Sequence, residues 1–279
     1  MERFRRGWRL GMVSLGVLRR DRALGAFPIL GGLTALFAIA AFGIPAAVLF
    51  EGNQTIGAVV LAALAIYAST YLTVFFGVAL AGAANAAFEG RGASVGEGVG
   101  VARSRAGAIA GWAGILASVN IILRAIEERF GFVGTIVAVV IGAAWGLITF
   151  LVIPVIAIEG LGPIAALKRS ARIFRARWGE QVIGTVSIGL MVFVFGVLPA
   201  ALLVGIGFLI GTTVALAATI SVAVVIVMVA AVIGQAATGI FSVALYRYAI
   251  GEGAAAPFAE ADLAGAFAPK RGRTQTGQI

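Results

Sequence analysis

The chain contains no cysteine and no histidine, and it has few charged residues of either sign. Without cysteine there are no disulfides, thiolate nucleophiles, palmitoyl anchors or cysteine-bound metals. Without histidine it lacks the usual general base and the commonest metal ligand. Only 12% of its residues are charged and 61% are hydrophobic, whereas soluble domains carry about 25% charged residues. Such a chain cannot cover a soluble surface, so the composition predicts a membrane protein.

Residues that carry chemistry are also scarce. The only aspartates, Asp21 and Asp262, lie outside the long apolar stretches, and no glycine-rich phosphate loop ending in lysine is present. The apolar stretches contain no charged residue, whereas proton relays and coupled pumps typically keep one. We therefore expect no enzyme, no catalytic residue, no metal and no cofactor.

Charged residues divide the chain into five uncharged stretches, and a membrane span needs roughly 20 apolar residues. Four stretches have the length of one span each: Ala23 to Phe50, Gly52 to Phe88, Ala106 to Leu123 and Phe130 to Ile158. The fifth, Gln181 to Tyr246, is too long for one helix, and the glycines between Gly205 and Gly211, followed by Thr212 and Thr213, predict a tight turn. The sequence thus predicts six transmembrane helices. A three-span interpretation of the fifth stretch would place the C-terminal tail on the opposite side.

Basic residues indicate the orientation, because cytoplasmic loops are enriched in them. The segments before the first span and after the second, fourth and sixth spans hold 19 of the 21 Lys and Arg. The other face has only Arg124 and Arg129, beside Glu127 and Glu128. Both termini are therefore expected in the cytoplasm of a bacterial cell, which disfavours the three-span interpretation. Because the basic residues lie between apolar runs, the net charge of +9 favours an anionic membrane face over nucleic acid.

Two basic segments have the pattern of amphipathic interfacial helices. In the first, residues 1–22, the stripe Phe4, Trp8, Met12, Leu15 and Leu18 faces away from a cluster of arginines. In the second, the stripe is Ile164, Leu167, Ala171, Phe174 and Trp178. One interpretation is that both segments only fix the topology; the other is that they bind anionic lipid headgroups or a partner protein. The candidate headgroup residues are Arg3, Arg5, Arg6, Trp8, Arg9, Lys168, Arg169, Arg172, Arg177 and Trp178.

Uncharged polar residues occur within the predicted spans, most densely in the second. They can form hydrogen bonds between helices, which a polar group in hydrocarbon requires. Alternatively, they line a solute pocket, for which the candidates are Tyr67, Thr70, Tyr71 and Thr73.

A Glu-Gly pair closes the second, fourth and sixth spans, at Glu89, Glu159 and Glu252. Glycine is expected after a helix end because it adopts the left-handed cap conformation without strain. Glutamate is not expected there, because the helix C-terminus is already partly negative. The repeat predicts that each Glu has a cationic partner, in the basic segment that follows or in a neighbouring repeat.

The segment from Glu159 to Ser170, with Arg175 and Trp178-Gly179 after it, resembles a stretch of uncharacterised bacterial six-helix membrane proteins, which form a domain family of unknown function. The ending from Phe241 to Gly251, with Tyr246-Arg247-Tyr248, is similar to the same family. More distantly the chain resembles the membrane domain joined to some glycerophosphodiester phosphodiesterases, whose separate catalytic domain it lacks. The resemblance implies a helical membrane bundle and no established activity.

We therefore expect an all-α, polytopic membrane bundle of six transmembrane helices with cytoplasmic amphipathic helices. Residues 1–22 are the interfacial helix, 23–249 the transmembrane domain, and 250–279 a partly disordered cytoplasmic tail. The expected function is non-catalytic binding of membrane lipids, chiefly anionic ones, or of a membrane-protein partner or second copy. The alternative is a transporter or channel for an uncharged or hydrophobic solute, which requires a continuous polar cavity from one face to the midplane.

Overall fold

The computed structural model describes residues 12–14, 16–18, 20–21, 23–176 and 188–253. These residues are almost entirely helical, with no β-strand among them. Helices are the expected form because hydrocarbon offers no water to the backbone, and a helix satisfies its internal N–H and C=O groups itself. The helices are α2 (Ala23–Glu51), α3 (Thr55–Phe88), α4 (Val95–Ser104), α5 (Ala106–Thr149), α6 (Val152–Ile158), α7 (Pro163–Ala176), the π-helix η1 (Phe193–Val197), α9 (Leu198–Ile210) and α10 (Thr213–Ala249).

Five helical stretches are long and apolar enough to cross a bilayer. They are Ala23–Glu51, Thr55–Phe88, Ala106–Ile158, Ile188–Ile210 and Thr213–Ala249. Few of their residues are buried: the buried share of the most apolar 18 residues is at most 17%, and in the last stretch it is only 6%. An exposed apolar surface of this extent is a liability in water and is matched by lipid. The fold therefore agrees with the predicted class, a membrane protein built as a helical bundle.

Two short turns fold four of the helices into hairpins. Between α2 and α3 the chain reverses at Asn53, whose φ of 58° lies in the left-handed region that asparagine tolerates. Between α9 and α10, Gly211 takes a φ of 74°, and the Thr212 hydroxyl accepts a hydrogen bond from the backbone N–H of Ala215. The turn predicted within the cluster ending at Thr213 is thus confirmed.

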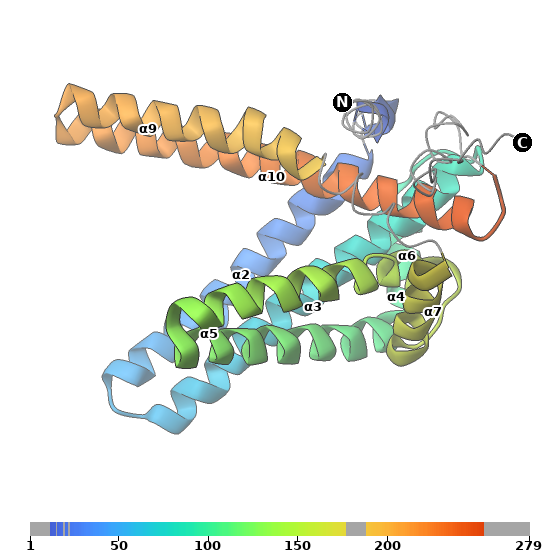
Figure 1. Ribbon diagram of the computed structural model, residues 1–279, viewed down its shortest axis with the longest axis horizontal. Coiled ribbons are helices and arrows are strands. Elements are labelled where there is room, and N and C mark those ends of the chain that lie inside the picture. Colours follow the sequence, from blue (N-terminus) through green and yellow to red (C-terminus); the bar gives the residue numbers. More distant parts are fainter. Residues whose placement is uncertain (1–11, 15, 19, 22, 177–187, 254–279) are drawn as a thin grey trace, which may run out of the picture.

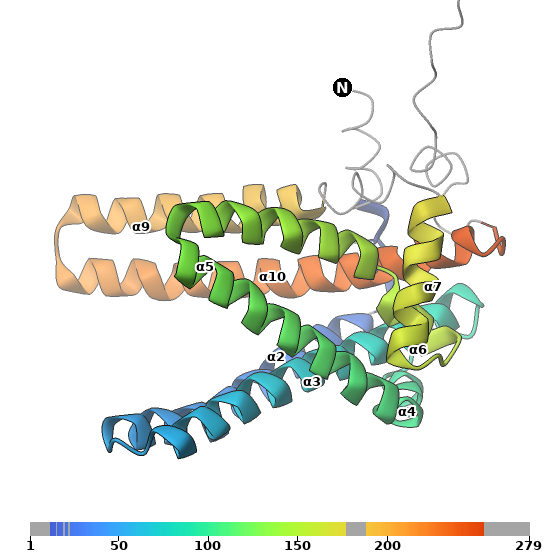
Figure 2. The same cartoon turned by 60° about the horizontal axis from the view of Figure 1, so that its bottom comes forward.

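The helix α5 is itself a hairpin. Its backbone leaves helical geometry at Gly131, with φ 55° and ψ −133°, and the chain then runs back alongside itself (Figures 1 and 2). The sequence predicted one unbroken span up to Ile158, but the return half of α5 ends earlier. The helix stops at Thr149, and α6 begins at Val152. Pro154 explains the break, because it has no N–H to bond the carbonyl four residues earlier.

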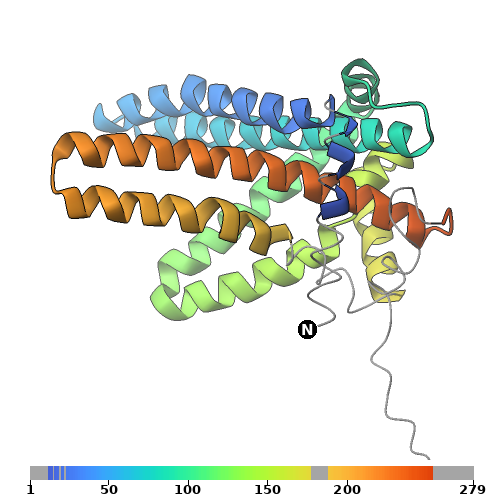
Figure 3. The ribbon, with the colours of Figure 1, turned by 90° about the horizontal axis from the view of Figure 1, so that it is seen from above.

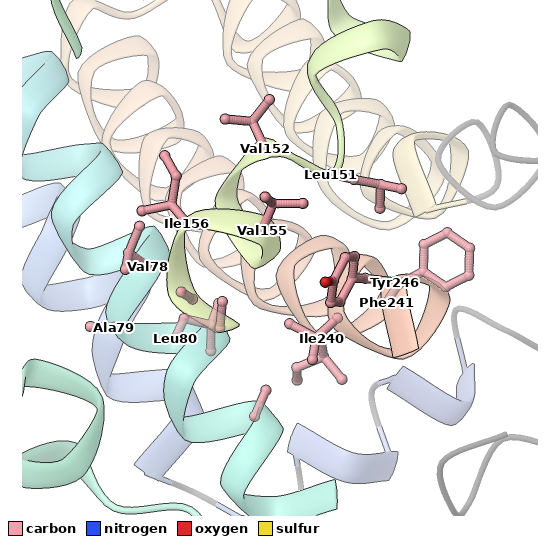
Figure 4. Packing of buried hydrophobic residues seen from close by; sticks show 14 of the residues in the cluster. Val78, Ala79, Leu80, Leu151, Val152, Val155, Ile156, Ile240, Phe241 and Tyr246 are labelled. Carbon is pink, nitrogen blue, oxygen red and sulfur yellow. The ribbon is translucent and has the colours of Figure 1, made fainter. Parts of the chain in front are cut away.

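The three hairpins join at one end and spread apart at the other. Their turns, which we term the hairpin tips, all lie at the left in Figures 1 to 3, whereas α4, α6 and α7 gather at the opposite, junction end. The main buried core also lies toward this end, where α6 packs between α3 and α10 (Figure 4). Its labelled members are Val78, Ala79, Leu80, Leu151, Val152, Val155, Ile156, Ile240, Phe241 and Tyr246.

The short helix α4 was not expected from the sequence. Its N-cap is Ser94, whose hydroxyl accepts a hydrogen bond from the backbone N–H of Glu97, and the helix packs against α3. Glycine permits the close approach: a Cβ at Gly98 would collide with the carbonyl oxygen of Ala79, and one at Gly82 would lie 2.9 Å from Val101. The signal that could have identified α4 is the Ser-x-x-Glu capping box.

Candidate functional site

The first part of the candidate site is a network of charged side chains at the junction end. Glu89, just after α3, pairs with Arg91 at 2.5 Å, and its neighbour Asn85 donates a hydrogen bond of 2.8 Å to it. Arg91 also pairs with Glu97 of α4. The hydrogen bond from Arg91, followed by that from Asn85, holds the pKa of Glu89 below its ordinary value. This carboxylate therefore stays ionised and connects α3 to the start of α4.

A second carboxylate, Glu159, connects α6, α7 and α10. It accepts a hydrogen bond of 2.9 Å from Nε of Arg169 on α7, and another from the Tyr246 hydroxyl on α10. Gly160 follows with a φ of 68°, and the Arg105 guanidinium occupies the place of its missing Cβ. A side chain at position 160 would thus displace both the backbone and the guanidinium.

Arg247, the neighbour of Tyr246 in the chain, connects α10 to α3. Its side chain is only 14% exposed and donates a hydrogen bond of 2.7 Å to Asn85, with Glu89 at 3.4 Å and Glu252 at 2.9 Å. We name this set the junction network: Asn85, Glu89, Arg91, Glu97, Glu159, Arg169, Tyr246, Arg247 and Glu252. It joins the ends of all three hairpins.

The junction network contains all three glutamates of the Glu-Gly repeat. Glu89 pairs with Arg91 of the following segment and with Arg247 of a neighbouring repeat. Glu159 pairs with Arg169 of the segment that follows it. Glu252 differs, because its partner Arg247 lies in the helix that precedes it. The glycines after the three glutamates all have left-handed backbones, with φ between 68° and 80°, as the sequence predicted.

The helix α7 covers the junction end and presents cations outward. Ala166, Ser170, Ile173 and Phe174 form its buried side, whereas Ile164 of the predicted stripe is 53% exposed. The stripe is therefore rotated from its predicted position. Two polar contacts account for this: the Ser170 hydroxyl donates to the carbonyl of Ile148, and Arg169 is drawn to Glu159.

Of the predicted headgroup residues, Lys168 and Arg172 are exposed on α7, as is the nearby Arg175. None of these three forms an ion pair with the described part of the chain. Arg169 is instead held in the junction network. The remaining predicted residues, Arg3, Arg5, Arg6, Trp8, Arg9, Arg177 and Trp178, lie outside the described residues.

The polar residues of the second span are mostly bonded to backbone. The Tyr67 hydroxyl donates to the carbonyl of Ala110 on α5, and Thr70 donates to a carbonyl of its own helix. The ring of Tyr71 lies beside that of Phe75, with centroids 6.2 Å apart. Thr73 is the one of the four predicted pocket residues that lines the cavity described next.

A cavity of about 530 Å³ lies between α2, α3, α5, α6 and α10, beside the buried core. Its wall is mostly apolar and includes Phe27, Trp112 and five glycines. Its uncharged polar residues come from three helices: Thr73, Thr149, Gln235, Thr238 and Ser242. The sequence predicted a pocket in the second span alone. It did not group these five residues, because only the fold brings α5 and α10 to the same space.

A metal centre has no support within the described ranges, where no three His, Cys, Asp or Glu residues are grouped to hold an ion. Comparison with protein families gives one informative result. Residues 55–256 match the profile described as "Family of unknown function (DUF6159)". The chain belongs to this family. Comparisons with curated proteins and with solved structures gave no match. Membership in DUF6159 agrees with the resemblance to an uncharacterised family, whereas the likeness to the phosphodiesterase membrane domain has no support from these comparisons.

Proposed function

We propose that the chain is a six-span protein of the bacterial cytoplasmic membrane, with both termini on the cytoplasmic side. The two halves of α5 count as separate spans, because the helix reverses at Gly131. The distribution of charge supports the orientation: the junction end carries Lys168 and most of the exposed arginines, whereas the tips carry only Arg124 and Arg129 among basic residues of the described chain.

The function we infer is non-catalytic binding of anionic lipid headgroups at the junction end. The observation that carries it is the outward face of α7, where Lys168, Arg172 and Arg175 are exposed and have no carboxylate partner among the described residues. Unpaired cations beside a membrane attract anionic lipid by about 1 kcal/mol each. The buried side of the same helix, together with Arg169, fixes α7 to the bundle.

The cavity between the hairpins favours binding over conduction. A channel or transporter requires a continuous polar route, whereas the wall of this cavity is mostly apolar and its polar residues are uncharged and scattered over three helices. We therefore prefer the binding function to the transport alternative.

Spin-labelled lipids added to the protein in mixed bilayers test this function. Phosphatidylglycerol should be enriched over phosphatidylcholine at the wild-type surface. The variant Lys168→Gln/Arg172→Gln/Arg175→Gln should lose most of that enrichment, and salt should weaken it in the wild type. The matched control is Arg124→Gln/Arg129→Gln, which removes two cations from the tips. Equal enrichment in the triple variant and the wild type would contradict headgroup binding by α7.

A further inference from the structure

We propose that the cavity between the hairpins binds one uncharged single-chain amphiphile, a long-chain alcohol or a similar molecule with a hydroxyl or carbonyl group at one end. The proposal is independent of headgroup binding by α7, because it concerns a different part of the molecule. It follows from the size of the cavity, its uncharged and mostly apolar lining, and the hydrogen bonds that its polar side chains make or lack.

The cavity has the size of a ligand site, and glycines form part of its wall. Its volume of about 530 Å³ falls within the roughly 300–1,000 Å³ of small-molecule sites. Five glycines line it: Gly31, Gly32, Gly77, Gly234 and Gly239. A Cβ added at Gly32 would meet no heavy atom within 4 Å, so this backbone borders open space. A larger residue there would add bulk at the exposed edge of the cavity without a clash.

The lining contains no charged residue, so the ligand is neutral. An ionised group placed there would lose its hydration and find no counter-charge, at a cost of several kcal/mol. The mostly apolar wall, with Phe27, Leu80 and Ile153 from three helices, matches a hydrocarbon chain. These features exclude a fatty-acid anion or a phospholipid headgroup from the cavity itself.

Gln235 provides the polar anchor. It lies 14 residues before the end of α10, which places it about 21 Å along the helix from the junction end. Within the described chain its amide makes no hydrogen bond, although a polar group at this depth is costly unless it is paired. The amide offers both a donor and an acceptor to a ligand.

The threonine hydroxyls in the wall of the cavity are available to a ligand mainly as acceptors. Thr73 donates to the carbonyl of Ser69, and Thr149 donates to that of Trp145, so each hydroxyl proton is already used by its own helix. Their oxygens keep free lone pairs. A ligand hydroxyl can thus donate to a threonine or accept from the Gln235 amide. Since Gly32, Thr73 and Gln235 are exposed at the edge of the cavity, the hydrocarbon chain can enter from the bilayer.

Tryptophan fluorescence tests the site directly, because Trp112 lines the cavity and stacks on Trp145. The full-length protein carrying Trp8→Phe and Trp178→Phe is placed in zwitterionic nanodiscs and titrated with a dibrominated long-chain alcohol. Saturable quenching is expected. The corresponding dibrominated hydrocarbon should bind more weakly, and the ionised carboxylic acid should show no saturable phase.

Two variants separate the cavity from its polar anchor. Gly32→Leu adds a bulky side chain at the edge of the cavity and should abolish the saturable phase. The control is Gly205→Leu on α9, another exposed helical glycine where an added Cβ would meet nothing within 4 Å, and it should keep the saturable phase. Gln235→Leu should weaken binding of the alcohol about threefold to tenfold, the loss of one hydrogen bond, and leave the hydrocarbon unchanged.

Unaltered saturable quenching in Gly32→Leu would overturn the site, as would strictly linear quenching in the wild type. Equal affinity for the alcohol and the carboxylate anion, or no effect of Gln235→Leu on the alcohol, would overturn the ligand class. If Gly32→Leu fails to fold, the near-isosteric Gln235→Leu still decides the proposal.

Discussion

At the scale of residues, two neighbours on α10 hold the hairpins together. Tyr246 and Arg247 are adjacent in the chain, yet one donates to Glu159 and the other reaches Asn85 and Glu89. Successive residues on a helix point about 100° apart, so one turn of α10 can serve two different neighbours. The third Glu-Gly pair extends the same connection through Glu252.

The contribution of Glu159 is measured by a matched pair of substitutions. Glu159→Gln removes the charge that Arg169 and Tyr246 share, and we expect a loss of about 1–3 kcal/mol of stability. Glu127→Gln removes a carboxylate near the tips that has no ion pair within the described residues, so it should have little effect. Melting temperatures in detergent provide the measurement. Equal melting temperatures for the two variants would show that the Glu-Gly pair at Glu159 only marks a helix end and adds no stabilising ion pair.

Acid should weaken the junction through Glu89. Folding lowers the pKa of this carboxyl from its ordinary value of 4.5. Its contribution to the free energy of unfolding is therefore complete above pH 4.5 and disappears as the pH falls through the folded-state pKa. We expect the melting temperature to drop on acidification, and to drop less in Glu89→Gln than in the wild type. Glu128→Gln, which changes an exposed carboxyl near the tips, serves as the control and should keep the wild-type dependence.

At the scale of elements, local chemistry explains both the successes and the failures of sequence-based prediction. The turn at Gly211 was predictable because glycines interrupt a run too long for one helix. The break before α6 was not predicted, although Pro154 is its local cause, because the uncharged run continues through it to Ile158. The helix α4 was missed because a ten-residue helix with a weak apolar stripe resembles a polar loop until it packs on α3.

The packing of α4 on α3 is tested by two glycines of one helix. Gly98→Ala puts a methyl group against the carbonyl of Ala79 and 2.6 Å from the ring of Phe27, so we expect a loss of about 1–3 kcal/mol from overpacking. Gly100→Ala meets no atom within 4 Å and should be neutral, or stabilising by up to about 1 kcal/mol through helix propensity. Thermal unfolding in detergent compares the two. A Gly98→Ala variant as stable as the wild type would mean that α4 does not pack as described.

At the scale of the whole molecule, the sequence predicts which segments can cross a membrane and leaves their grouping open. Hydropathy and charge predict helices because each span needs only its own residues. The cavity and the junction network depend on contacts between distant segments, as between Asn85 and Arg247, which no local pattern encodes. The pocket predicted from Tyr67 to Thr73 therefore contributed one residue to a cavity completed by α5 and α10.

Topology is the prediction that tests the whole arrangement. If the junction end faces the cytoplasm, reporter fusions after Arg91, Arg172 and Lys270 should report a cytoplasmic location. Fusions after Gly52, near Glu127 and near Thr212 lie at the hairpin tips and should report the opposite side. The fusion near Glu127 is the most informative, because it distinguishes a hairpin reversed at Gly131 from one continuous helix through Ile158. A cytoplasmic signal at Glu127, or an external one at Lys270, would reject the six-span arrangement. It would also remove the argument that α7 meets anionic lipid, because that argument requires the junction end to face the leaflet with the negative surface potential.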